Sequence, residues 1–268
     1  MAVHVLHVSK TGGTAMRYAI RRERRAAGGT LPSPWGPIWA HEHGFRLADV
    51  PKDDRAVITL RDPVSRFLSG FCSRQRKGAP RHCREWTDAE RMAFQYFSTP
   101  QELADALAEP PGETRERAEF AMRSITHLKR RLILWTGRPA YLLRHLDKVL
   151  YFARQETLDD DWERLKELLE LPSGVILPRD DVVAHRTIYP YDLALSREGV
   201  EALRAWYAED YEVLEIAEHL RQGLAPPRVS LTARLRSLLR EGRAASRELL
   251  PERPVLPRVR VEQRSEAA

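Results

Sequence analysis

The residues best suited to chemistry lie near the amino terminus, where residues 10–14 read Lys-Thr-Gly-Gly-Thr. Adjacent glycines let backbone N–H groups approach a phosphate or sulfate closely. Lysine supplies a full positive charge, and the threonines supply hydroxyl donors. The residues of the predicted anion-binding turn are Lys10, Thr11, Gly12, Gly13 and Thr14. The alternative is an ordinary turn with a surface lysine, which would have the same composition.

The flanking residues predict the elements that position this turn. Val3, Val5 and Val8 are β-branched and favour a strand before it. Residues 15–20 are compatible with a helix after it, whose amino terminus would add a partial positive charge. A Walker A loop is not indicated, because there the lysine follows the glycines and here it precedes them.

A second segment, residues 56–71, repeats this strand–turn–helix order. Residues 57–60 predict a strand with Arg61 at its end. Asp62 suits a helix N-cap and Pro63 the first helical position. An apolar stripe follows at helical spacing: Val64, Phe67, Leu68 and Phe71. Since ligands of open α/β sheets bind beyond the carboxyl ends of the strands, both segments place their polar groups where a ligand is expected.

Together the two segments resemble sulfotransferases that use 3′-phosphoadenosine 5′-phosphosulfate (PAPS), most closely the carbohydrate and heparan-sulfate 2-O branch. Residues 10–14 resemble their 5′-phosphosulfate loop, with Lys10 as a catalytic residue, and residues 61–71 resemble their 3′-phosphate motif. The resemblance implies that Arg61 and Ser69 bind the 3′-phosphate and that PAPS is the co-substrate, with no metal. Ser9 stands where that branch usually has proline.

Three histidines are candidates for the base that such a transfer needs. Histidine suits the role because its pKa lies near neutrality. An H-x-H sequence places His41 and His43 between the two segments, and the resemblance implies that His43 is the base and His41 its neighbour. Loop histidines that cap backbone groups are the alternative. His127 is a further candidate base, with a structural histidine as its alternative. Metal binding is not favoured, because no further ligands follow at suitable spacing.

The predicted fold class is α/β, with a P-loop-like open parallel sheet flanked by helices. Capping boxes at Thr87 and Thr99 begin two helices of a helical insertion, and a third helix runs from Thr114 to His127. Another strand is predicted at 148–153, and the acidic residues 159–161 after it are interpreted as partners of a helix dipole. Residues 1–222 form the predicted α/β domain, and residues 223–268 a basic, Pro/Arg-rich extension with an amphipathic helix over 231–250.

Composition limits the class of protein. The 268 residues are 43% hydrophobic and 31% charged, as in a globular protein, with no apolar run long enough to span a membrane. Of the net charge of +6, most comes from the extension, which holds ten arginines and five glutamates. We therefore expect a cytoplasmic protein that binds no specific nucleic acid sequence. Its tail could contact an acidic partner or a membrane surface, and its two cysteines are expected to be free thiols.

The favoured function is transfer of a sulfuryl group from PAPS to a hydroxyl of a glycan, lipid or small-molecule acceptor. One alternative is a P-loop-type kinase or NTPase, which would bind ATP with magnesium. The other is a non-catalytic protein that binds nucleotides or polyanions and keeps the turn without the chemistry.

Overall fold

A computed structural model describes residues 1–80, 82–180 and 193–223. Apart from Gly223, the predicted extension, with its helix over 231–250, lies outside these ranges. Within them, no helix is long and apolar enough to cross a membrane. Both cysteines are described and unbridged, Cys72 buried and Cys83 exposed.

The centre of the fold is a four-stranded sheet in which every neighbouring pair is parallel. Its strands are β1 (Val3–Leu6), β2 (Ile38–Ala40), β3 (Arg55–Leu60) and β4 (Val149–Arg154), in the order β2-β1-β3-β4. An open α/β fold with a parallel sheet is thereby confirmed. The strands predicted at 57–60 and 148–153 correspond to β3 and β4.

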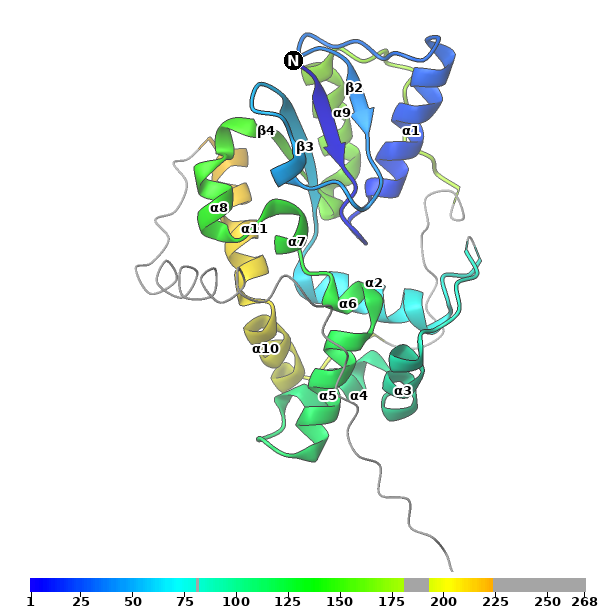
Figure 1. The fold of residues 1–268 in the computed structure, drawn as a ribbon, viewed down its shortest axis with the longest axis vertical. Helices are drawn as coiled ribbons and strands as arrows, with labels where there is room; N and C mark the ends of the chain where they lie inside the picture. The colour runs from blue at the N-terminus through cyan, green and yellow to red at the C-terminus, as the bar shows by residue number, and fades with distance from the viewer. Residues whose placement is uncertain (81, 181–192, 224–268) are drawn as a thin grey trace, which may run out of the picture.

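Helices cover both faces of this sheet (Figure 1). One face packs against α1 (Gly13–Ala26) and α9 (Leu158–Leu169). The other packs against α7 (Ile133–Thr136), α8 (Pro139–Arg144) and α11 (Ala208–Arg221). Alternation along the strands creates the two cores: Val3, Val5 and Val57 face α1 and α9, whereas Leu6 and Ile58 face α7, α8 and α11.

The remaining helices form a separate layer beyond the carboxyl ends of the strands (Figure 1). They are α2 (Pro63–Gln75), α3 (Asp88–Tyr96), α4 (Pro100–Ala108), α5 (Glu113–Ser124), α6 (Thr126–Lys129) and α10 (Arg197–Trp206). Their shared core includes Phe67 and Phe71 of the predicted α2 stripe. Both predicted capping boxes are present, at Thr87 with Glu90 and at Thr99 with Glu102. The predicted insertion is therefore confirmed as a layer of helices.

Short 3₁₀ helices complete the connections: η1 (Leu47–Asp49), η2 (Leu146–Lys148) and η3 (Gln155–Thr157). The helix predicted over 114–127 is interrupted. α5 ends at Ser124, and Ile125 takes an extended conformation (φ −66°, ψ 117°) before α6 begins. After this break α6 packs against α2, where His127 has a different environment from the rest of the predicted helix.

Candidate functional site

The strand order changes direction between β1 and β3. After β1 the chain returns to pair β2 on one side, and β3 lies on the other side of β1. The connections that leave β1 and β3 therefore diverge, and such a point is where ligands bind in open α/β sheets. Lys10 and Arg61 follow these two strands, and Nη1 of Arg61 donates to the Lys10 carbonyl at 3.4 Å. The two predicted segments thus meet; residues 10–14 together with Arg61 are called the cradle below.

The amino terminus of α1 is left open toward the cradle. Its N-cap is Gly12, in the left-handed region (φ 82°), and among the described residues no side chain caps the helix. A Cβ on Gly13 would lie 2.9 Å from Cδ2 of His7 and 3.3 Å from Oγ1 of Thr59, so only glycine allows this approach. Among the described residues, the N–H groups of Gly13 and Thr14 at the start of the helix are therefore available to an anion, whereas that of Ala15 donates to the Gly12 carbonyl at 3.0 Å.

The threonine hydroxyls have partners within the protein. Oγ1 of Thr11 is buried, donates to the Val8 carbonyl at 3.0 Å and lies 2.6 Å from Oγ1 of Thr59. Oγ1 of Thr14 lies 3.2 Å from Nε2 of His7. Thr11 thus fastens the turn to β3, and Thr14 contacts His7, which follows β1. That the backbone amides of these residues bind an anion stays a prediction.

Lys10 is held in a cluster of cations. Its backbone is left-handed (φ 66°). Burial, together with the charges of Arg76 and Arg61, lowers the pKa of its ammonium group to about 7. An anion bound beside this ammonium group would raise its pKa, restore its proton and balance the charge of the nearby arginines.

One face of α2 lines the cradle. Ser65, Ser69, Cys72 and Arg76 follow one another at helical spacing, and two of them, Cys72 and Arg76, are close enough to affect Lys10 electrostatically. Nε of Arg61 donates to Oγ of Ser65 at 2.9 Å. Ser69 is buried one turn further along the same face.

His43 has the geometry of a base. Its Nδ1 lies 2.9 Å from the His7 carbonyl, which can only accept, so Nδ1 carries the proton and Nε2 keeps its lone pair. The ring stacks on His7 with centroids 3.7 Å apart. Burial lowers its pKa, so the imidazole is neutral at physiological pH. Among the described residues, none hydrogen bonds its Nε2.

His41 lies in a different cluster. Its Nε2 is 2.8 Å from Nδ1 of His4, and Nε2 of His4 is 2.9 Å from Oδ2 of Asp54. Its ring stacks on Phe45, and burial, with His4 and Arg21 nearby, lowers its pKa to about 4. His41 therefore neighbours His43 in sequence and belongs to a structural chain of side chains that ends at Asp54.

Sequence reasoning missed the role of Arg66, which fixes the layer of helices against the cradle. This arginine is 1% exposed. Its Nε donates to the Ser9 carbonyl at 2.9 Å, and its Nη2 donates to the carbonyls of His127, at 3.3 Å, and Arg130. Nothing in the pattern signals burial, because arginines are ordinarily solvated.

The amino terminus of α2 is closed by side chains. Oδ1 of Asp62 accepts from the Ser65 amide at 2.8 Å, as predicted for an N-cap, and Oδ2 accepts from the Tyr211 hydroxyl at 2.9 Å. The Asp62 amide itself donates to Oε1 of Glu156 at 2.7 Å. These contacts join β3, β4 and α11 at one point.

The acidic run in the first turn of α9, residues 159–161, differs from its interpretation at one residue. Asp161 is 1% exposed and does more than balance a helix dipole. It accepts from the Tyr151 hydroxyl, the Arg154 amide, the Thr157 hydroxyl and Arg221, all at 2.6–2.8 Å. It therefore locks the end of β4 to α9 and α11.

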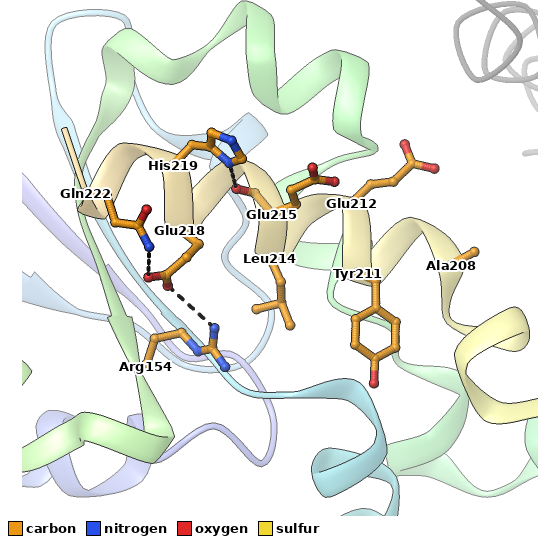
Figure 2. A pocket seen from close by; sticks show the side chains of 9 residues that line it. All are labelled: Arg154, Ala208, Tyr211, Glu212, Leu214, Glu215, Glu218, His219 and Gln222. Atoms are coloured by element: carbon orange, nitrogen blue, oxygen red, sulfur yellow. Dashed lines mark hydrogen bonds and ion pairs between the residues drawn. The ribbon is translucent and has the colours of Figure 1, made fainter. Parts of the chain in front are cut away.

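A hollow of about 530 Å³ lies along α11, outside the cradle (Figure 2). Glu218 lies 3.8 Å from Nη1 of Arg154 and accepts from Nε2 of Gln222, and His219 pairs with the Glu215 carbonyl. These polar groups thus pair within the lining, and none of the predicted site residues is part of it. Its lining is Arg154, Ala208, Tyr211, Glu212, Leu214, Glu215, Glu218, His219 and Gln222.

No family model and no curated protein matches this chain. The function is therefore argued from the geometry above. Within the described ranges, no group of three His, Cys, Asp or Glu side chains is arranged to hold a metal ion. The cradle combines an open helix terminus, a cluster of cations and a neutral histidine, which suits binding of an anionic group and proton removal beside it.

Proposed function

We propose that this protein is a sulfotransferase that uses PAPS as its co-substrate. The observation that carries the proposal is the contact of Arg61 with the Lys10 carbonyl, where the strand order changes direction between β1 and β3, beside the uncapped terminus of α1. One ligand with two anionic groups, such as PAPS with its 3′-phosphate and 5′-phosphosulfate, would contact both segments. The backbone amides of residues 11–14 would hold the phosphosulfate, and Arg61 with Ser69 the 3′-phosphate.

The proposed step is transfer of a sulfuryl group to an acceptor hydroxyl of a glycan, lipid or small molecule. The acceptor oxygen forms a bond to sulfur while the bond between sulfur and the bridging oxygen breaks. The electron pair of that bond stays on the 5′-phosphate of the leaving nucleotide. The proton of the hydroxyl passes to Nε2 of His43, and Lys10 balances the charge that develops on the bridging oxygen.

The first test is thermal unfolding with 3′-phosphoadenosine 5′-phosphate, the desulfated product, compared with ADP and with ATP and magnesium. At about 100 times its dissociation constant a ligand stabilises the folded state by about 2.7 kcal/mol, which raises the melting temperature by several degrees. We expect this shift with the 3′-phosphorylated nucleotide and its loss in Lys10→Ala and Arg61→Ala. A shift with ATP and magnesium alone would favour the kinase or NTPase instead.

The second test separates binding from chemistry. His43→Gln should keep the thermal shift and lose transfer, measured as release of inorganic sulfate from PAPS with water as acceptor. His41→Gln is the matched control, because it lies two residues away in a separate cluster. Equal rates in the His43 variant and the unmodified protein would exclude His43 as the base. A protein that binds the nucleotide and transfers no sulfuryl group to water or to any other acceptor would be the non-catalytic alternative.

A further inference from the structure

His127 lies beside the cradle, and the step above does not use it. Its Nδ1 is 3.0 Å from Oγ of Ser9, the residue that precedes Lys10, across 118 positions of sequence. Its Nε2 has no hydrogen-bond partner among the described residues, and this atom is not fully buried. The ring is thus anchored at one nitrogen and open at the other.

The position of His127 is fixed by several independent contacts. Arg66 donates to the carbonyls of both Ser9 and His127. A Cβ on Gly70 would lie 3.0 Å from Cβ of His127, so glycine at this position of α2 permits the close packing of α6. The amide of Thr126 donates to Oε1 of Glu90 at 3.0 Å. An imidazole held this firmly is preorganised.

The two histidines beside the cradle are anchored by chemically different partners. His43 faces a carbonyl, which fixes the proton on Nδ1 and leaves Nε2 as an acceptor. His127 faces a hydroxyl, which can donate to Nδ1 and leave the proton on Nε2. Burial and the charges of Lys10, Arg66 and Arg74 hold the pKa of His127 well below its usual range. It is therefore a neutral group, and an anion beside it favours the tautomer with a proton on Nε2.

We propose that His127 is a second imidazole of the transfer site, which donates a hydrogen bond from Nε2 to an oxygen of the anion held beside Lys10, with Ser9 fixing this tautomer. This inference rests on the proposed function, since the anion is the sulfuryl group in transfer. His43 then takes the acceptor proton as His127 stabilises the group that moves. One site uses two neutral histidines of opposite tautomer.

The test is nitrogen NMR of the imidazoles in the full chain, with His127→Gln and His43→Gln to assign the signals. Inorganic sulfate and then 3′-phosphoadenosine 5′-phosphate are added as probes. We expect His43 protonated at Nδ1 and His127 at Nε2, with the His127 Nε2 signal moving on addition of sulfate. Ser9→Ala should leave a mixture of tautomers at His127. A His127 that stays protonated at Nδ1 with sulfate present would overturn the inference.

Sulfate release from PAPS gives a second readout. His127→Ala should slow it about 100-fold, the usual cost of losing one preorganised donor, with nucleotide affinity within about twofold. His127→Gln, which keeps an amide donor, should recover most of the rate, and His219→Gln is a distant control. If the nucleotide binds and His127→Ala keeps the full rate, this inference alone fails. If neither probe binds, the proposed function fails with it.

Discussion

The two strand-to-helix junctions of this protein have the same local order and opposite chemistry. At the β3–α2 junction Asp62 caps the helix and is itself held by Tyr211, with Glu156 on its amide. At the β1–α1 junction the N-cap is Gly12, no described side chain caps the helix, and the nearest charges are cationic. One junction is closed by acidic side chains, so the positive end of its helix is already balanced. The other is left for an external anion.

The closed junction also supports the open one. Arg66 begins on α2, one turn after Asp62, and reaches the Ser9 carbonyl beside the cradle. The turn that binds the anion is therefore positioned from the neighbouring element, and its own residues keep their amides available. Substitutions at the closed junction should therefore change mainly the stability of the fold, and substitutions at the open junction mainly the binding of the anion.

The largest expected effect is that of Arg66→Ala. Three carbonyls would lose their donor at a buried position, so the free energy of unfolding should fall by about 3 kcal/mol or more. Urea unfolding measures this. Arg197→Ala is the comparison, because its pair with Glu201 is 85% and 62% exposed and should contribute under about 0.5 kcal/mol. Equal effects of the two substitutions would contradict the role given to Arg66.

A smaller effect is expected at the closed junction. Asp62→Ala removes the N-cap of α2 and the acceptor of the Tyr211 hydroxyl, and should cost about 1–2 kcal/mol of unfolding free energy. Tyr211→Phe removes only the hydroxyl and should cost about 1 kcal/mol. Urea unfolding of both variants tests this order. A Tyr211 variant less stable than the Asp62 variant would show that the cap contributes little.

The smallest change in stability is expected at Gly12, where binding should respond most. Gly12→Ala and Gly28→Ala both place alanine at a left-handed φ, 82° and 75°, and each should cost about 1 kcal/mol. Only at Gly12 would the new Cβ meet a neighbour, Cδ2 of Leu158 at 2.7 Å. Nucleotide binding, followed by calorimetry, should therefore weaken in Gly12→Ala alone. Equal affinities would mean that this turn does not contact the ligand.

Sequence analysis predicted the helices, the strands and the two segments of the candidate site better than it predicted the contacts between side chains within that site. Strand patterning, the Asp62-Pro63 cap and the two capping boxes are local signals, and all correspond to elements of the structure. The proximity of Lys10 and Arg61 followed from a general property of parallel sheets. These predictions depend on residues close together in the chain or on a rule of topology.

The contacts that sequence analysis missed join residues far apart in the chain, and the types of these residues do not indicate that they are buried. Arg66 resembles a surface arginine, and Asp161 resembles a dipole partner, yet each is about 1% exposed and satisfied by groups from other elements. The pairing of Ser9 with His127 depends on the break at Ile125, which no residue type announces. Gly70 is the one usable signal, because a glycine within an apolar helix indicates close packing.

The most direct test of the open junction is calorimetry of 3′-phosphoadenosine 5′-phosphate in buffers of different ionisation heat. Burial and the charges of Arg76, Arg61 and Arg66 leave Lys10 with a pKa of about 7, although Cys72 acts in the opposite direction, and a bound anion must raise it. At pH 8 most of the free protein has an uncharged Lys10, so binding should take up nearly one proton, and at pH 6 almost none. Affinity should fall as the pH rises above 7.

Lys10→Arg keeps the positive charge and does not titrate in this range, so the variant should bind with proton uptake near zero at pH 8. We predict that the unmodified protein takes up a proton when it binds the nucleotide at pH 8 and that this variant does not. That result would place the anion at Lys10. Tight binding with the same proton uptake in both proteins would contradict it, because the ligand would then bind elsewhere.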